Sequence, residues 1–302
     1  MPRPAFRGGP VHVRVPATSA NLGPGFDSLG LALSLFDDVV ARVADDGLVV
    51  DVAGEGADVP RDETHLVVRA MRAGFERLGG QPHGLELSCA NRIPHSRGLG
   101  SSAAAIVAGV VLARALVVGG AQRLPDAELL ALAAELEGHP DNVAGCLLGG
   151  LTVAWTDTAA RAVRLDCDPG IRPVVFVPPF TASTAQARGL LPATVPHADA
   201  AFAAGRSALL VAALTGATGA QFAATEDRLH QQYRAPAMPQ SAELVAVLRA
   251  SGAAAVVSGA GPTVLALARD EVEAEKLLPL APPDWQPLAL AVDPVGAHVL
   301  VR

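Results

Sequence analysis

The sequence predicts an α+β protein with two domains and a cleft between them. Three observations predict this class. The chain has 302 residues, which is enough for two domains. Segments with the alternation of strands and segments with the periodicity of helices are mixed in both halves. A turn-rich stretch at 166–170 separates the halves, so we expect one domain over 1–168 and a second over 169–302.

The composition is that of a well-packed globular chain, because 50% of the residues are apolar and only 18% are charged. The net charge of −7 gives no electrostatic reason to expect nucleic acid or an anionic membrane as a partner. No apolar run has the length of a membrane span. The three cysteines, Cys89, Cys146 and Cys167, are odd in number and lie in mostly apolar surroundings, which predicts reduced thiols in a cytoplasmic protein.

The first half begins with a basic segment that has no apolar stretch typical of a secretory signal, and we expect a disordered arm there. Val11, Val13 and Val15 then alternate with polar residues, as in a half-buried strand, and a loop dense in turn formers follows over 16–27. The other elements expected in this half are strands over 48–52, 85–89 and 151–155 and helices over 66–78, 103–118 and 125–137.

The second half opens with a buried strand over 173–177 and a loop over 181–188. The patterns that follow predict helices over 199–214, 220–230, 242–251 and 271–278, and strands over 253–258, 263–267, 288–292 and 297–301.

The most informative stretch is the glycine loop at 94–104, PHSRGLGSSAA. Gly98 and Gly100 allow a positive φ and a close approach of a ligand to the backbone. Ser101 and Ser102 stand where the buried helix begins, and Ser is a favoured cap at that place. A glycine loop that leads into a helix N-terminus is a ready site for an anion, and the anion we expect is a nucleotide polyphosphate.

Two familiar phosphate-binding motifs do not fit this loop. A Walker A motif needs a Lys after its last Gly, but Gly100 is followed directly by Ser101. The dinucleotide fingerprint needs three glycines at spacings that the loop lacks. A plain capping turn without a ligand remains an alternative for the segment taken alone.

The pattern PxxxGLGSSAA resembles the phosphate loop of the GHMP kinases, and PATSANLGPGFD at 16–27 resembles the N-terminal motif of the homoserine kinases within that family. HPDN at 139–142 and SGAGPT at 258–263 extend the resemblance over nearly the whole chain. It implies the two-domain GHMP kinase fold, with a ribosomal-protein-S5-domain-2-like N-terminal domain, a ferredoxin-like C-terminal domain and the active site in the cleft.

The resemblance implies an ATP-dependent kinase that uses Mg²⁺ and phosphorylates the hydroxyl of L-homoserine in threonine biosynthesis. One rival is a GHMP kinase for another small alcohol, such as a mevalonate-pathway intermediate. The other is a nucleotide-binding protein on this fold that has lost catalysis. Many relatives are dimers, so a homodimer is an open possibility for this chain.

The resemblance also implies roles for individual residues. A substrate with an ammonium and a hydroxyl needs a carboxylate and an amide nearby, and an Arg fork suits its carboxylate. The residues expected to contact homoserine are Asn21, Asp27, His139, Arg188, Arg234 and Gly259. Those expected to bind the nucleotide are Pro94, His95, Ser96, Arg97, Gly98, Leu99, Gly100, Ser101, Ser102, Ala103, Ala104 and His65.

The expected metal ligands are Glu137, Asn142, Ser102 and Thr184, with Glu135 as a competing carboxylate. The expected catalytic residues are Asp141, Asn21 and Ser101. Asp141 either takes the proton of the hydroxyl or acts through positioning and charge stabilisation, which phosphoryl transfer allows.

Two positions depart from the pattern of the homoserine kinases. Some members carry extra residues between the glycine and the histidine, but here Gly138 directly precedes His139. His65-Leu66 stands where the family usually has Asn-Leu at the adenine side, so His65 would have to stack on or hydrogen-bond to the base.

Overall fold

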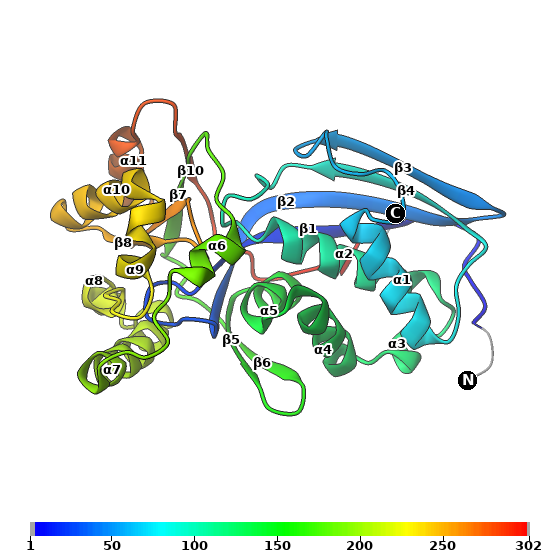
Figure 1. Ribbon diagram of the computed structural model, residues 1–302, viewed down its shortest axis with the longest axis horizontal. Coiled ribbons are helices and arrows are strands. Elements are labelled where there is room, and N and C mark those ends of the chain that lie inside the picture. Colours follow the sequence, from blue (N-terminus) through cyan, green and yellow to red (C-terminus); the bar gives the residue numbers. More distant parts are fainter. Residues whose placement is uncertain (1–3, 301–302) are drawn as a thin grey trace.

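The computed structural model describes residues 4–300, with the backbone alone at Thr184. Figure 1 shows two parts, each built from a sheet and helices, which confirms the α+β class. The first part contains β1 (Val11–Ala20), β2 (Leu29–Ala44), β3 (Gly47–Gly54), α1 (Leu66–Leu78), β4 (Gly84–Asn91), α2 (Ser101–Leu116), α3 (Gly120–Arg123), α4 (Asp126–Glu137), α5 (Pro140–Leu148), β5 (Leu151–Thr156) and β6 (Ala160–Leu165).

The second part follows β6 along the chain. It contains β7 (Arg172–Val177), α6 (Thr184–Gly189), α7 (His197–Leu214), η1 (Thr218–Ala220), α8 (Gln221–Ala224), α9 (Gln231–Arg234), η2 (Ala235–Ala237), α10 (Pro239–Ala250), β8 (Ala254–Val257), β9 (Val264–Ala268), α11 (Glu271–Leu277), η3 (Leu278–Leu280) and β10 (Gln286–Ala289). A last short strand, β11 (His298–Val299), ends the described chain.

Seven strands of the described chain form the first sheet, in the order β11-β1-β2-β4-β3, with β5 and β6 continuing from β2. The central strand β2 has 16 residues and pairs antiparallel with β1, β4 and β5. The sequence did not predict β2, and it placed residues 16–20 in a loop. These residues continue β1 past an irregularity between Pro16 and Ala17. They show no alternation because the strand is buried on both faces there.

Helix α2 lies at the centre of the first part and is buried on nearly every side. It packs against α1 so closely that a Cβ on Gly109 would lie 2.6 Å from the Cβ of Ala70, so only glycine fits. The predicted serine cap is wrong. Gly100 is the N-cap in the left-handed region at φ 70°, no side chain between residues 4 and 300 caps the helix, and Ser101 is already its first residue.

The second sheet has the order β10-β7-β9-β8, all antiparallel. Its strands carry a second core, in which Val174 and Phe176 of β7 pack with Leu244 and Leu248 of α10. This sheet begins within a few residues of the expected boundary at 168/169.

The end of the chain returns to the first sheet. After β10, Ala291 O accepts a hydrogen bond from Ser34 N at 2.9 Å, and β11 pairs antiparallel with β1. The first sheet therefore includes a strand that the predicted division assigned to the second domain. The predicted strand over 297–301 extends past residue 300, beyond the described chain.

Several shorter elements differ from the expectation. The sequence did not predict α5 or β6, and α6 lies where a loop was expected. The helix predicted over 220–230 ends at Ala224, and the next helix, α9, begins only at Gln231. Asp227 organises the turn between them. Its carboxylate accepts hydrogen bonds from the backbone N–H groups of Leu229, His230 and Gln231 at 2.7, 3.2 and 2.8 Å.

The N-terminal segment is ordered from residue 4 onward, contrary to the expected disordered arm, whose first three residues lie outside the described chain. Phe6 packs edge-to-face on Phe75 at 5.6 Å, and Arg7 N donates to Leu116 O at 2.8 Å. The three cysteines are free thiols, and Cys89 and Cys146 are buried as expected. Over residues 4–300, no helix combines the length and the apolar character that a bilayer crossing requires.

Candidate active site

The residues expected to contact homoserine all line one cavity between the two parts of the molecule, together with the expected catalytic residues and the expected metal ligands except Thr184. Of the expected nucleotide-binding residues, Ser96, Gly98, Gly100, Ser101 and Ser102 line it. His65, His95 and Ala104 line a second cavity instead, and Pro94, Arg97, Leu99 and Ala103 line neither of the two. The first cavity has a volume of about 80 Å³. It is lined by Asn21, Asp27, Ser96, Gly98, Gly100, Ser101, Ser102, Glu137, His139, Asp141, Asn142, Ala182, Arg188, Arg234, Gly259, Ala260 and Gly261. Motifs more than 200 residues apart in the sequence therefore face the same space.

The glycine loop and the second glycine turn at 258–263 pack directly against each other. Ser258 Oγ donates a hydrogen bond to Gly98 O at 2.6 Å. Gly98 has φ 79°, and a Cβ there would lie 2.8 Å from Gly261 O, so this contact requires glycine. The second part of the molecule thus supports the loop expected to bind phosphate.

The first turn of α2 opens into the cavity through Ser101 and Ser102. Since Ala104 N makes the first helical hydrogen bond, to Gly100 O at 2.9 Å, the N–H groups at 101–103 have no helical partner. These donors and the positive end of the helix dipole suit a phosphate.

Glu137 ends α4 beside this helix start. Its Oε1 accepts a hydrogen bond from Ser102 Oγ at 2.6 Å. Burial raises the pKa of the Glu137 carboxyl, and the Ser102 hydrogen bond opposes the shift. Glu135 instead forms a surface ion pair with Arg77 at 2.8 Å and does not line the cavity.

His139, Asp141 and Asn142 form a connected polar group at the start of α5. Asp141 Oδ1 accepts hydrogen bonds from His139 Nδ1 at 2.6 Å and from Asn142 N at 2.8 Å. The hydrogen bond with Asp141 raises the pKa of the His139 imidazole, and burial opposes it. Asn142 Oδ1 accepts from Thr18 Oγ1 at 2.8 Å, which fixes the amide next to the glycine loop.

The loop after β1 is held by side chains rather than by regular structure. Asn21 Nδ2 donates to Gly259 O, and Asp27 N donates to Asn21 Oδ1, both at 2.9 Å. Asn21, Leu22 and Asp27 all have φ between 52° and 66°, a region that side chains rarely adopt. Strained backbone of this kind persists where the surroundings determine it, and it is concentrated at binding sites.

Asp27 and Arg188 form a two-pronged ion pair across the cavity. Arg188 Nη1 and Nη2 donate to the two carboxylate oxygens of Asp27 at 2.8 and 2.9 Å. Both side chains remain partly exposed, at 35% for Asp27 and 43% for Arg188, so they can be reached from the cavity.

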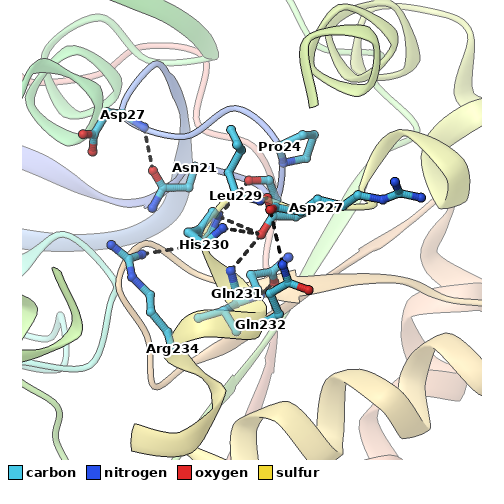
Figure 2. Close-up of polar contacts among 12 residues, drawn as sticks. Asn21, Pro24, Asp27, Asp227, Leu229, His230, Gln231, Gln232 and Arg234 are labelled. Carbon is cyan, nitrogen blue, oxygen red and sulfur yellow. Dashed lines mark hydrogen bonds and ion pairs between the residues drawn. The ribbon is translucent and has the colours of Figure 1, made fainter. Parts of the chain in front are cut away.

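Arg234 is the buried cation of the site. Its Nε donates to Ala187 O at 3.3 Å, its Nη1 donates to His230 Nδ1 at 3.2 Å, and Figure 2 shows this last contact beside Asn21 and Asp27. Burial lowers the pKa of the Arg234 guanidinium, and the charge of Arg188 lowers it further. The group nevertheless stays charged near neutral pH, because an arginine guanidinium is not deprotonated in proteins.

A second cavity, of about 250 Å³, shares Ser96, Ser101 and Ser102 with the first. His65, which the resemblance places at the adenine side, lies in its wall. The Nδ1 atom of His65 is buried and has no hydrogen-bond partner among the residues that the structure describes. A buried polar atom without a partner is costly, so a ligand that supplies one would be favoured here.

Sequence analysis missed four residues that shape these cavities. Asp37 lies in the wall of the second cavity, where burial raises the pKa of its carboxyl. Thr18 hydrogen-bonds to Asn142, and His230 hydrogen-bonds to Arg234. The ring centroid of Phe26 lies 5.3 Å from the guanidinium carbon of Arg234. The one available signal was the spacing of His230 and Arg234, which are four residues apart, as on one helix face.

No group of three or more His, Cys, Asp or Glu side chains in the described residues could hold a metal ion. A Mg²⁺ that accompanies a nucleotide does not need such a group, because it binds one or two carboxylates, phosphate oxygens and water. Glu137, with Ser102 and Asn142 lining the same cavity, fits that requirement. The side chain of Thr184 lies outside the described part of the structure.

Two family models match the chain, "GHMP kinases N terminal domain" over residues 65–150 and "GHMP kinases C terminal" over residues 200–278. The glycine loop and Glu137 lie within the first match, and Arg234 and Gly259 lie within the second. The fold and the site therefore define an ATP-dependent small-molecule kinase of the GHMP type.

The relatives narrow this class. A homoserine kinase of Streptomyces coelicolor is 63% identical over 302 residues, covering 99% of this chain and 97% of that protein. One from Streptomyces avermitilis is 62% identical and covers 99% of each. The crystal structure of homoserine kinase from Cytophaga hutchinsonii has a TM-score of 0.85 at 27% identity, over 98% of both chains. The chain belongs to the homoserine kinases within the GHMP kinase family.

Proposed function

We propose that this chain transfers the γ-phosphoryl group of ATP to the hydroxyl of L-homoserine, giving ADP and O-phospho-L-homoserine for threonine synthesis. One observation carries the proposal beyond the family relationship. The Asp27–Arg188 ion pair and the Arg234 guanidinium lie in the same cavity as the glycine loop. Among small alcohols, a hydroxy amino acid matches both signs of charge, because it carries an ammonium and a carboxylate.

Homoserine would bind across the ion pair. Its ammonium lies at Asp27, and its carboxylate lies at Arg188 and Arg234, whose planar forks match a carboxylate. In the absence of substrate the two charged groups at 27 and 188 satisfy each other, so neither is left unpaired. Asn21, His139 and Gly259 complete this pocket and would orient the substrate hydroxyl toward the glycine loop.

ATP would bind with its phosphates on the loop at 94–104 and on the first N–H groups of α2. Its base would enter the cavity that contains His65, where an adenine nitrogen or amino group can pair with the imidazole Nδ1. Ser96, Ser101 and Ser102 lie in both cavities and would contact the phosphates between them.

Glu137, Ser102 and Asn142 would hold Mg²⁺, and by resemblance Thr184 would join them. When bound, the ion neutralises charge on the transferred phosphate and its leaving group. Because the Ser102 hydroxyl already donates to Glu137, the side chain of the glutamate is preset toward the start of α2.

Asp141 can act in either of the two ways that the sequence left open. Its Oδ1 accepts both hydrogen bonds found among the described residues, from His139 and from Asn142. Its Oδ2 is therefore the atom that would accept the proton of the homoserine hydroxyl. In the alternative, Asp141 fixes His139 and Asn142, and the reaction proceeds through positioning and charge stabilisation.

An ADP-release assay over homoserine, serine, threonine, mevalonate and galactose tests the proposal. We expect homoserine to give by far the highest kcat/KM. Mevalonate has no ammonium to pair with Asp27, so it would leave that charge with only Arg188. Faster turnover of mevalonate or galactose would favour a GHMP kinase for another small alcohol. The absence of turnover with every alcohol would favour a nucleotide-binding protein that has lost catalysis.

A further inference from the structure

His230 is a fully buried histidine that none of the steps above uses. It lies in the loop before α9, one helical turn from Arg234, and Arg234 N donates to His230 O at 3.1 Å. Figure 2 shows its ring between the loop that carries Asn21 and the guanidinium of Arg234. The ring therefore lies between the two parts of the molecule.

The hydrogen bonds of the ring fix its protonation. Arg234 Nη1 lies 3.2 Å from His230 Nδ1, and a guanidinium can only donate, so Nδ1 carries the lone pair. The ring proton is then on Nε2, which donates to Gly23 O at 2.8 Å. His230 is thus the neutral Nε2–H tautomer, and burial, which lowers the pKa of the imidazole, favours the same form.

The charged groups around the ring agree with this assignment. Arg234 faces Nδ1, and Asp227 Oδ2 lies 3.6 Å from Nε2, while Asp27 acts from farther away. The Asp227 carboxylate is already used by the backbone N–H groups of Leu229, His230 and Gln231. It fixes the backbone at His230 rather than drawing a second proton onto the ring.

The guanidinium of Arg234 is consequently held at one side. Its Nε donates to Ala187 O, and its Nη1 donates to His230 Nδ1 and, at 3.5 Å, to Gly259 O. Its Nη2 donates to no residue between 4 and 300, and Arg234 lines the cavity. Nη2 is therefore the end left for a ligand.

We propose that His230 is a positioning residue for homoserine: its neutral Nδ1 accepts from Nη1 of Arg234 and thereby presents Nη2 to the substrate carboxylate. This inference rests on the proposed function. The His230 ring also connects the loop at 16–27 with the second part of the molecule, because it hydrogen-bonds to the carbonyl of Gly23 and to the guanidinium of Arg234.

Two substitutions test the two ring nitrogens of His230 separately. In His230→Gln the amide reaches the position of Nε2, so the donor to Gly23 O can be kept while the acceptor for Arg234 is lost. In His230→Asn the amide oxygen lies near the position of Nδ1, so the acceptor is kept and the donor to Gly23 is lost. Gln232→Ala, two residues along at an exposed position, is the control.

We expect His230→Gln to raise the KM for homoserine about tenfold, the loss typical of one hydrogen bond to a charged group. The KM for ATP and kcat should hardly change. His230→Asn should recover most of the affinity, and Gln232→Ala should behave as the wild type. With 3-aminopropan-1-ol, which has no carboxylate, His230→Gln and the wild type should have the same kcat/KM.

The proposal is overturned if His230→Gln leaves the KM for homoserine unchanged, if His230→Asn is as poor as His230→Gln, or if both substrates lose the same factor. Should the variants not fold, long-range ¹H–¹⁵N spectra of the wild type report the tautomer directly. A proton on Nδ1 of His230 near neutral pH would also overturn it. If the wild type itself does not phosphorylate homoserine, the proposed function fails, which is a different result from a wild-type-like His230→Gln.

Discussion

Glu135 and Glu137 lie two residues apart on α4 and end in opposite surroundings. A step of two residues turns a helix by about 200°, so only one of the two side chains can face the cavity. Glu137 does so beside Ser102, and Glu135 pairs with Arg77 at the surface. Helical geometry thus separates two residues that the sequence left as competing metal ligands.

We predict that Glu137→Gln lowers kcat by about 10²-fold or more, since it removes the carboxylate charge at nearly constant volume. Glu135→Gln is the matched control and should lose little, because an exposed ion pair contributes little. Steady-state kinetics at saturating ATP and homoserine measure both. A large loss in Glu135→Gln with an active Glu137→Gln would reverse the assignment.

We predict that Arg234→Ala weakens homoserine binding by about 1.5–3 kcal/mol, the range for a hydrogen bond to a charged group. The KM for ATP should hardly move, because Arg234 lines the first cavity and not the second one, which contains His65. The comparison with 3-aminopropan-1-ol is decisive here as well. An equal loss on both substrates would mean that Arg234 does not recognise the carboxylate.

Individual site residues could be predicted from the sequence where a motif carried them. The contacts between them could not. Asp27 and Arg188 are 161 positions apart, and nothing local says that they pair. His230 looked like an ordinary helical residue, because its role depends on a carbonyl at Gly23 that only the fold brings near.

At the scale of elements, the start of α2 depends on one backbone conformation. Gly100 has φ 70°, and a Cβ there would collide with Thr18 Oγ1 and lie 3.1 Å from Asn142 Oδ1. Gly119, the N-cap of α3, has nearly the same φ, 69°, but a Cβ there would meet only Gln122 Oε1 at 3.7 Å. A side chain at Gly119 would therefore cause backbone strain alone, whereas a side chain at Gly100 would cause the same strain and a steric collision as well.

We predict that Gly119→Ala costs about 1–2 kcal/mol of unfolding free energy, the cost of a left-handed residue with a Cβ, and leaves ATP affinity unchanged. Gly100→Ala should cost more and should weaken ATP, because it displaces the Thr18–Asn142 hydrogen bond beside the loop. Urea unfolding and nucleotide titration measure the two effects. Equal ATP affinity in the two variants would contradict a phosphate role for this loop.

Asp38 on β2 forms a charged cluster with His12 and Arg14 on the neighbouring strand β1. Its carboxylate accepts hydrogen bonds from Arg14 at 2.9 and 3.0 Å and from His12 at 3.1 Å. Burial raises the pKa of the Asp38 carboxyl, but the hydrogen bond and charge of Arg14, together with His12, outweigh it. The resulting pKa lies below the ordinary value of 3.8.

A carboxyl with a lowered pKa in the folded state stabilises the protein above its unfolded-state value and loses that effect as the pH falls toward its folded-state value. We therefore predict that Asp38→Asn lowers the unfolding free energy by about 1.5 kcal/mol at pH 7. The two stability curves should converge below about pH 4. Curves that stay parallel down to pH 3 would contradict the assignment.

The elements that the sequence predicted best have one exposed and one buried face. Helix α1 was predicted residue for residue, since its apolar stripe is regular. The strands that escaped prediction lack that contrast. β2 has five consecutive buried residues at its start, and β6 has no fully buried residue, since each of its positions is either half-buried or exposed. Periodicity cannot identify a strand whose two sides see the same environment.

At the scale of the whole molecule, the family resemblance identified two domains and a cleft, which composition and periodicity only suggested. The return of β11 to the first sheet could not be predicted. A strand over 297–301 was predicted, but its place was not, because the pairing partners of His298 and Val299 lie on β1 at the other end of the chain.

The two tryptophans of the chain report on its two parts. Trp155 lies on β5 of the first sheet, and Trp285 precedes β10 in the second. Because the end of the chain hydrogen-bonds to both sheets, we predict that the parts unfold together. Fluorescence of Trp155→Phe and Trp285→Phe in urea should give one midpoint, after correction for each variant's own stability by circular dichroism. Two separate midpoints would show that the parts are independent.

The course of the chain also limits how the cleft can open. The polypeptide leaves the first part after β6 and comes back after β10, so the second part is attached at two places rather than at one. A body on a single tether can swivel in any direction, whereas one on two tethers can only bend about the line through them. Opening to admit ATP and homoserine is then a hinge motion about one axis, and each closure returns Arg188 and Arg234 to the same place opposite the glycine loop.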